Sequence, residues 1–164
     1  GYLTSNYANW PLFIPIMLLS AAFIGACAGS TGGGIKVIRS LVLMRQGVGE
    51  ITKLIHPNAV VSIKFGKKSL DPRVAESVWG FFSLYVATFI VLLMFMLSQS
   101  NDFLTSFSAV GATLNNLGPG LGEVSSNYKE LNDASKLGLC LAMLLGRLEI
   151  FTLLLVFTPA FWRS

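Results

Sequence analysis

The run Val78–Leu97 constrains the fold of this chain more than any other feature, because it contains no charged residue. A helix that crosses a bilayer needs roughly 20 consecutive apolar residues, and this run is long enough. Two further runs have the same character: Trp10–Ala28 has no charge, and Leu137–Phe161 is interrupted only by Arg147 and Glu149. Charged residues make up 12% of the 164 residues, whereas soluble domains carry about 25%. The sequence therefore predicts an all-α integral membrane protein.

The charges between these runs predict the orientation of the chain in the membrane. The connection before Val78–Leu97 is rich in basic residues: Lys36, Arg39, Arg45, Lys53, Lys64, Lys67, Lys68 and Arg73. The connection after it is mainly acidic: Asp102, Glu123, Glu130 and Asp133. Because positive connections stay in the cytoplasm, we expect the first inside and the second outside. This topology accounts for the basic residues, so no nucleic-acid partner is expected.

Metal and nucleotide chemistry find little support in the sequence. The two cysteines, Cys27 and Cys140, stand in separate apolar runs without metal-ligand spacing. The segment GACAGSTGGGIK, residues 25–36, has the glycine spacing of a phosphate-binding loop. However, Ile35 stands where that motif needs lysine, and Val37 stands where it needs a hydroxyl. We therefore predict neither an enzyme nor a bound cofactor.

The outer connection predicts a re-entrant segment. Asp102–Leu114 is apolar but too short to span a bilayer, and Asp102 is a favourable acid for the first turn of a helix. The following NNLGPGLG, Asn115–Gly122, holds glycines and a proline that end a helix. A half-helix followed by an extended glycine-rich loop can direct backbone carbonyls at a cation. On the residues alone, an ion filter and an ordinary outer turn remain equally open.

A short repeat links the first and third apolar runs. Ser5-Asn6-Tyr7 precedes the first run and Ser126-Asn127-Tyr128 precedes the third, and the same offset carries Gly25 onto Gly146. Transporters are commonly built from repeats, so we interpret these runs as equivalent inward-running helices. The glycine loop then falls at membrane depth, near the middle of a helix. A plain membrane anchor would need neither this loop nor an intramembrane arginine such as Arg147.

Three longer motifs carry a family resemblance: CAGSTGGGIKVIR (Cys27–Arg39), ATLNNLGPGLG (Ala112–Gly122) and MLLGRLEIFTLLLVFTPAFWR (Met143–Arg163). Together they resemble the bacterial TrkH family of potassium-uptake proteins, within the Trk/Ktr/HKT superfamily, over essentially the whole chain. The resemblance implies four helix–pore-loop–helix repeats around one potassium-channel-like pore. This chain would hold the last helix of the third repeat and the whole fourth repeat, the C-terminal part of a longer protein.

The resemblance also implies boundaries along the chain. Residues 1–46 would hold the end of the third filter and a broken spanning helix with an intramembrane glycine loop at 25–36. Residues 47–76 would form a basic cytoplasmic connection, and residues 77–98 would form the first spanning helix of the fourth repeat. Residues 101–122 would form the pore half-helix and filter loop, residues 123–136 an extracellular connection, and residues 137–162 the last spanning helix.

Particular residues take roles from the resemblance. The backbone carbonyls of Asn116 and Leu117 would bind potassium, Gly118 would be the filter glycine of this repeat, and Gly1 would end the third filter. Arg147 would project into the pore below the filter, face a gate loop on the inner side of the filter, and raise a barrier to cations. That gate loop would consist of Ala28, Gly29, Ser30, Thr31, Gly32, Gly33 and Gly34.

The function implied is potassium uptake across the bacterial inner membrane by a multi-pass protein in contact with lipid. The resemblance implies a homodimer and a cytoplasmic ring of a TrkA-type nucleotide-binding regulator, for which the basic segment Lys36–Arg73 is a reasonable docking surface. The transported potassium ion is the ligand expected, with no cofactor on this chain. Channel-like transport and transport coupled to protons or sodium both remain open.

Overall fold

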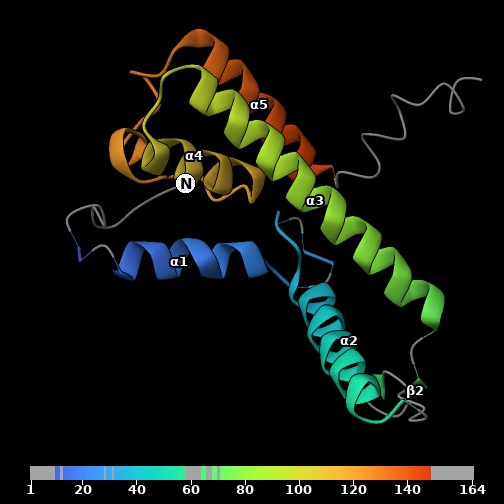
Figure 1. Cartoon of the computed structure of the whole chain (residues 1–164). Helices are drawn as coiled ribbons and strands as arrows, with labels where there is room; N and C mark the ends of the chain where they lie inside the picture. The colour runs from blue at the N-terminus through green and yellow to red at the C-terminus, as the bar shows by residue number, and fades with distance from the viewer. Residues whose placement is uncertain are drawn as a thin grey trace, which may run out of the picture.

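The computed structural model describes residues 10–11, 13–27, 29–30, 32–57, 64–65, 68–69 and 71–148. Its helices are α1 (Phe13–Ile24), α2 (Val37–Ile55), α3 (Pro72–Ser98), α4 (Phe103–Leu114), the short 3-10 helix η2 (Gly122–Val124) and α5 (Asp133–Arg147). The strands β1 (Lys64–Phe65) and β2 (Lys68–Ser69) form one antiparallel pair. The regular structure of the described residues is otherwise helical, which confirms the predicted all-α class (Figure 1). Gly1, Ala28, Thr31 and residues 149–162 of the last predicted span lie outside the described residues.

Helix α3 is the long apolar helix that the uncharged run predicts. The Asp71 side chain accepts a hydrogen bond from the Arg73 N–H at 3.0 Å, and a proline, Pro72, stands at the first helical position. These signals start the helix earlier than the predicted residue 77. Its 27 residues make it about 40 Å long, more than the roughly 30 Å of a bilayer core. Within the described segments it is the one helix long and apolar enough to cross a membrane.

Helix α4 is short and buried against its neighbours. Asp102 caps it by accepting a hydrogen bond from the Leu104 N–H at 3.1 Å. Its 12 residues make it about 18 Å long, too short to span a bilayer. Small and hydroxyl-bearing side chains let the neighbouring helices approach it closely. The buried positions are Thr105, Ser106, Ser108, Ala109, Val110, Gly111, Ala112, Thr113 and Leu114.

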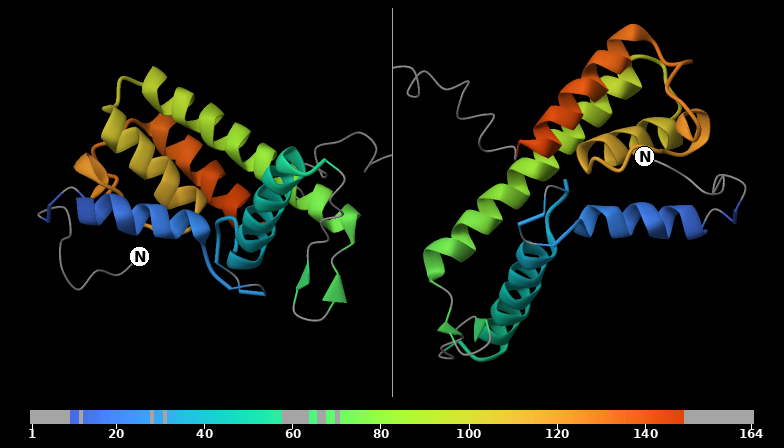
Figure 2. Two further views of the ribbon diagram at one scale, coloured as in Figure 1. Left: turned by 60° about the horizontal axis from the view of Figure 1, so that its bottom comes forward. Right: turned by 180° about the vertical axis from the view of Figure 1, so that it is seen from behind.

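The core lies where α3, α4 and α5 pack together. Helices α3 and α5 run side by side, and α4 lies against both of them (Figures 1 and 2). Lipid is as apolar as leucine, so close packing rather than removal from water holds such helices together in a bilayer. The large buried side chains of this core are Phe81, Tyr85, Leu92, Met96, Leu114, Leu139 and Leu145.

The first apolar run does not form one continuous helix. Helix α1 ends at Ile24, α2 begins at Val37, and the described residues between Gly25 and Lys36 are not helical. Helix α1 passes along one side of α4, whereas α2 leads away from the core toward the lower end of α3 (Figure 1). The glycine loop therefore separates two helices that run in different directions.

Helix α2 ends at Ile55, directly before His56-Pro57, and a residue before proline disfavours the helical conformation. His56 is its C-cap and donates its N–H to the Thr52 carbonyl at 2.8 Å. The helix occupies the first part of the predicted connection 47–76 because Val42 packs with Ala75 and Val78 of α3. Helix α2 thus covers the start of the predicted connection and α3 its end, and the strands β1 and β2 lie between them in the chain.

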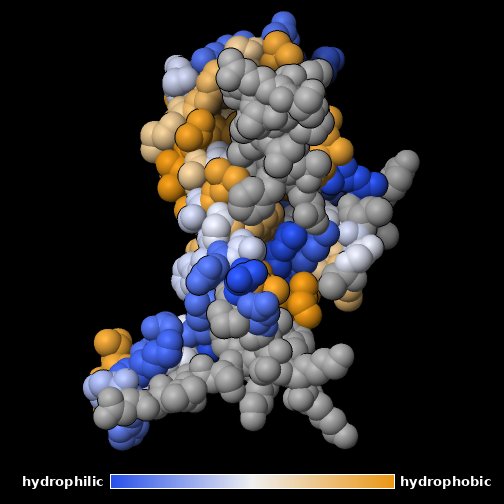
Figure 3. All heavy atoms as spheres, turned by 90° about the vertical axis from the view of Figure 1, so that its right-hand side faces the viewer, coloured by the Kyte–Doolittle hydropathy of each residue, from blue (hydrophilic) through white to orange (hydrophobic). Residues whose placement is uncertain are grey.

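Apolar side chains cover much of the surface around the α3–α5 bundle. On the face that Figure 3 shows, hydrophobic side chains gather over the upper part below a hydrophilic upper edge. Helix α3 exposes large apolar side chains that a bilayer would cover. They include Val86, Ile90, Val91, Met94 and Phe95.

An aromatic cluster holds the end of α1 to the core. The ring of Phe23 lies edge-on to Phe89 at 5.5 Å and to Tyr85 at 6.5 Å between ring centroids, and 6.4 Å from Phe107. Gly111 leaves space for it, because a Cβ there would lie 3.2 Å from the Phe23 ring. Such aromatic pairs contribute about 0.5–1.5 kcal/mol each. The chain is thus anchored just before the glycine loop begins.

We expect Phe23→Ala to lower the free energy of unfolding of the full-length protein by about 3 kcal/mol, because it empties the centre of this cluster. Thermal unfolding in detergent measures the effect. Phe13→Ala is the matched control, since Phe13 lies on the same helix and is 75% exposed. Equal shifts for the two variants would contradict the anchoring role of Phe23.

Candidate functional site

The chain after α4 turns its backbone N–H groups toward the protein. Those of Asn116 and Leu117 donate at 3.0 and 2.8 Å to carbonyls in the last turns of α4, and that of Gly118 does so at 3.4 Å. The N–H of Gly120 donates to a carbonyl of η2 at 3.1 Å, and Pro119 has no N–H. The backbone carbonyl oxygens of this loop can therefore face the opposite side.

None of the described residues donates a hydrogen bond to the carbonyl oxygen of Asn116 or to that of Leu117, and both residues are exposed. Asn116 has a φ of 54° and Gly118 a φ of 107°, so the backbone leaves its regular course at both positions. Uncharged oxygens held in this way can replace the hydration shell of a cation such as K⁺.

Two hydroxyl groups of α4 hold the outer half of the loop. Ser108 Oγ accepts a hydrogen bond from the Leu121 N–H at 2.8 Å and donates to the Leu121 carbonyl at 3.2 Å. Thr105 Oγ1 accepts a hydrogen bond from the Glu123 N–H at 3.4 Å. Gly122 passes so close that a Cβ there would lie 2.6 Å from Thr105 Oγ1. Both hydroxyls are buried, so lifting the loop would break hydrogen bonds worth about 1 kcal/mol each.

A tyrosine from the following connection reaches back to the middle of the loop. The hydroxyl of Tyr128 donates a hydrogen bond to the carbonyl of Gly118. Its ring is half-buried and packs against the core. The Gly118 carbonyl therefore accepts a hydrogen bond from a residue that the structure describes, whereas those of Asn116 and Leu117 do not.

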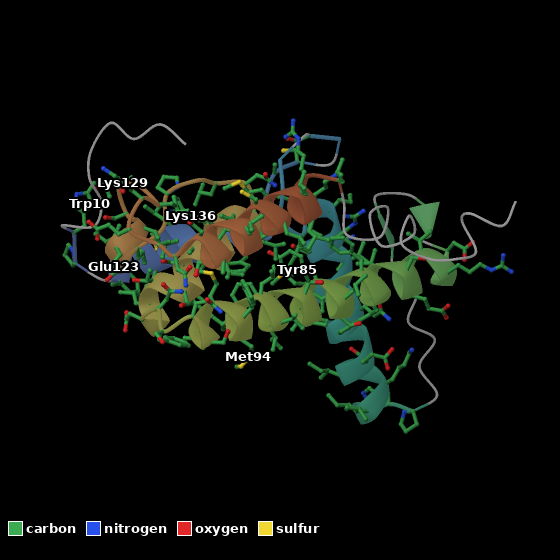
Figure 4. All side chains as sticks on the ribbon, turned by 90° about the horizontal axis from the view of Figure 1, so that it is seen from above. Trp10, Tyr85, Met94, Glu123, Lys129 and Lys136 are labelled. Atoms are coloured by element: carbon green, nitrogen blue, oxygen red, sulfur yellow. The ribbon has the colours of Figure 1, made fainter. Side chains whose placement is uncertain are left out.

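Asn115 joins the inner end of the loop to α3. Its buried side chain donates from Nδ2 to the Gly111 carbonyl at 2.7 Å, and its Oδ1 accepts a hydrogen bond from the Tyr85 hydroxyl at 2.8 Å. Tyr85 lies between α3 and α5 in the view from above (Figure 4). Because every one of these groups is buried, the inner end of the loop is tied to the core.

The glycine loop closes on itself at its base. The Ile35 N–H donates to the Phe23 carbonyl and the Val37 N–H donates to the Ala26 carbonyl, both at 3.2 Å. Gly25 has a φ of 78° and lies so close to the second half of the loop that a Cβ on it would be 2.8 Å from the Gly33 carbonyl oxygen. The loop is therefore held at its neck, while Cys27, Gly29 and Ser30 are exposed.

Three segments meet at Asn115 and Asn116. A Cβ on Gly33 would lie 2.7 Å from the Asn115 carbonyl, and one on Gly34 would lie 3.0 Å from Asn115 Oδ1. Gly146 of α5 is also close, since its Cβ would lie 2.9 Å from Asn116 Nδ2, the same distance as a Cβ on Gly33. Only glycine allows the glycine loop and α5 to approach the filter loop this closely.

Of the predicted gate loop, Gly33 and Gly34 thus lie beside the start of the predicted filter loop. Gly33 and Gly34 are buried, Gly32 is half-buried, and the Gly32 N–H donates to Ser30 Oγ at 3.2 Å. Arg147 follows Gly146 as the last residue of α5 and is exposed. The roles assigned to the filter, gate and barrier residues stay predictions.

Sequence reasoning missed the side chains that support the loop. Thr105 and Ser108 stand three residues apart on one face of an apolar helix, a pattern that could have indicated them. The repeated triplet pointed to Tyr128 without a reason for it. Asn115 and Tyr85 gave no signal in the sequence, because their hydrogen bond joins distant segments.

Among the described residues there is no group of three or more His, Cys, Asp or Glu side chains that could hold a metal ion. The oxygens that the site offers are backbone carbonyls, which suit an alkali cation in transit.

Comparison with known proteins assigns the family. The family model TrkH, described as a cation transport protein, matches residues 1–164. The Trk system potassium uptake protein TrkH of Vibrio parahaemolyticus is 55% identical over 164 residues, and the TrkG protein of Escherichia coli K12 is 44% identical. Each match covers 100% of this chain and 34% of the relative, so the chain spans about a third of the length of these relatives.

A solved structure gives the same assignment. The crystal structure of the potassium transporter TrkH from Vibrio parahaemolyticus matches with a TM-score of 0.90 and 55% identity. The match covers 99% of this chain and 35% of that chain. The relatives are transporters and not enzymes, in line with the absence of any catalytic motif in the sequence. This chain therefore belongs to the TrkH family of cation transport proteins, which are membrane transporters with pore-loop repeats.

Proposed function

We propose that the chain forms part of a pore for potassium uptake across the bacterial inner membrane, with Asn115–Gly122 as the filter loop of its repeat. The observation that carries this proposal is the division of backbone groups in that loop. The N–H groups are bonded to protein, and the carbonyl oxygens of Asn116 and Leu117 accept no hydrogen bond from the described residues. The names of the relatives, which are potassium uptake proteins, support potassium as the ion.

The glycine loop is the proposed gate. Its proposed extent is Ala28–Gly34, of which Gly29, Ser30 and Gly32–Gly34 are described. The support for this role is the close approach of Gly33 and Gly34 to Asn115, the residue directly before the proposed potassium ligands. A loop in that place can obstruct ions that leave the filter, and its glycines give it the backbone freedom to move.

Arg147 is the proposed barrier to cations. It is exposed at the C-terminus of α5, where the helix dipole favours a positive charge. Gly146, its neighbour, lies against the start of the filter loop. A fixed positive charge near that point raises the energy of a passing cation.

The assembly is part of the same proposal. The full-length protein would cross the inner membrane several times, with Gly1 at the end of the third filter and the boundaries derived from the sequence. A homodimer and a cytoplasmic TrkA-type ring are the proposed partners, since a Trk system has several components. The exposed apolar stripe of α2 supports a further packing partner on that helix. Its members are Val37, Leu41, Met44, Val48, Ile51 and Ile55.

We expect Gly118→Ser to lower the preference for potassium over sodium by about tenfold, because a side chain at a φ of 107° costs about 1–3 kcal/mol and moves the neighbouring carbonyls. Rubidium and sodium uptake by the full-length protein, in cells without other potassium uptake systems, measures the preference. Gly47→Ser is the control, because Gly47 lies in α2 with open space around it. An unchanged preference in Gly118→Ser would refute the filter assignment.

The gate proposal makes a different prediction for Gly33→Ala. Its methyl group would meet the Asn115 carbonyl at 2.7 Å, so the loop must withdraw. Overpacking of this kind costs about 1–3 kcal/mol, enough to shift the equilibrium between closed and open states by fivefold or more toward open. Single-channel or flux recordings on the reconstituted full-length protein should show more open time at an unchanged ion preference. Lost preference with normal gating would contradict the gate role.

Removal of the arginine charge tests the barrier. We expect Arg147→Ala to raise potassium flux by about tenfold, which corresponds to about 1.4 kcal/mol less repulsion at the barrier. Arg147→Lys keeps the charge and should stay near the wild-type flux. Both variants are measured by rubidium flux in proteoliposomes at equal protein content. Equal flux in the wild type and Arg147→Ala would show that this charge sets no barrier.

A further inference from the structure

Tyr128 makes a contact that the proposed function leaves unexplained. Its hydroxyl donates to the carbonyl of Gly118, ten residues earlier in the chain. Gly118 directly follows Asn116 and Leu117, whose carbonyls accept no hydrogen bond from the described residues, and its φ of 107° belongs to a region that side chains rarely allow. A glycine there is necessary for the turn, but glycine also has the least restrained backbone of all residues.

The other restraint on Gly118 is weak. Its N–H donates to the Ala112 carbonyl at 3.4 Å, whereas the Leu117 N–H reaches the same carbonyl at 2.8 Å. The next residue, Pro119, has no N–H with which to hold the chain. The Tyr128 hydroxyl is therefore the group that fixes the orientation of the Gly118 carbonyl.

The segment that carries Tyr128 is itself well anchored. Val124 and Leu131 are buried on either side of it, at 1% and 4% exposure. The Asn127 side chain accepts a hydrogen bond from the Lys129 N–H at 3.1 Å, which fixes the backbone around Tyr128. Figure 4 shows Glu123 and Lys129, which flank this segment, at one end of the molecule. The phenol thus reaches Gly118 from a rigid support.

We propose that Tyr128 is a positioning residue for the filter. Its hydroxyl sets the preference for potassium over sodium because it keeps the Gly118 carbonyl from rotating freely. This proposal rests on the filter assignment of the proposed function. Ion preference in a carbonyl filter depends on how many carbonyls face the ion and how freely they move. With the hydroxyl in place, Gly118 stays in one orientation, and the peptide that carries the Leu117 carbonyl stays with it.

The test is Tyr128→Phe in the full-length protein, which removes one oxygen and keeps the ring. We expect the preference for potassium over sodium to fall by about two- to tenfold, the range for loss of one hydrogen bond, while potassium flux persists. The ratio of rubidium to sodium uptake in proteoliposomes measures it and does not depend on protein amount. Thr88→Val is the control, because it removes a half-buried hydroxyl that bonds only within α3; its ratio should match that of the wild type.

A second measurement needs no transport. Potassium should raise the Tm of the purified wild-type protein more than sodium does, since the tighter ligand stabilises more. In Tyr128→Phe, the difference between the two Tm shifts should be smaller.

The parallel variant Gly118→Ser separates the role of Tyr128 from the filter assignment itself. An altered ratio in Gly118→Ser with a wild-type ratio in Tyr128→Phe would overturn the role of Tyr128 alone. A wild-type ratio in Gly118→Ser would overturn the filter assignment. A Tyr128→Phe protein that does not accumulate would also refute the proposal, since its hydroxyl would then serve folding.

Discussion

The rest of the structure depends on one constraint: backbone N–H groups at membrane depth have no water to bond with. The loop Asn115–Gly122 meets this constraint by turning its N–H groups toward α4 and η2. The hydroxyls of Thr105 and Ser108 serve the outer half of the loop in the same way. Because the N–H groups are used inward, the carbonyls of Asn116 and Leu117 face the other way. The chemistry proposed for the site is therefore a consequence of how the loop avoids unsatisfied donors.

Close approach is the second theme, and glycine makes it possible. Gly33 and Gly34 of the glycine loop and Gly146 of α5 all lie against Asn115 or Asn116. A displacement of the proposed gate would be transmitted to the proposed filter, because glycines bring the two so close that no long side chain absorbs it. The buried Tyr85–Asn115 hydrogen bond fixes the filter-loop side of this contact, and the Phe23 cluster fixes the chain just before the glycine loop.

Much of the fold was predictable because it rests on local patterns. The uncharged run gave α3, and the short apolar run followed by NNLGPGLG gave α4 and a loop. Helix boundaries were less predictable: α3 starts earlier through Asp71 and Pro72, and α2 extends to Ile55 because it packs on α3. Within the candidate site, the glycine pattern predicted a loop after α4, whereas the hydrogen bonds of Ser108 and Tyr128 to that loop were not predictable. Their partners lie 13 and 10 residues away, and a chain pattern carries no sign of such pairing.

The sequence by itself determined that this chain is helical, apolar enough for a membrane and broken by glycine at two places, Gly25–Lys36 and Asn115–Gly122. These properties follow from hydropathy and backbone preference, which act within a few residues. Only the tertiary structure decided that the two breaks lie close together, that Gly146 joins them, and that Tyr128 holds the Gly118 carbonyl, whereas no described residue donates to the carbonyls of Asn116 and Leu117. Such facts depend on which helices pack side by side, and packing is settled by contacts between residues far apart in the chain.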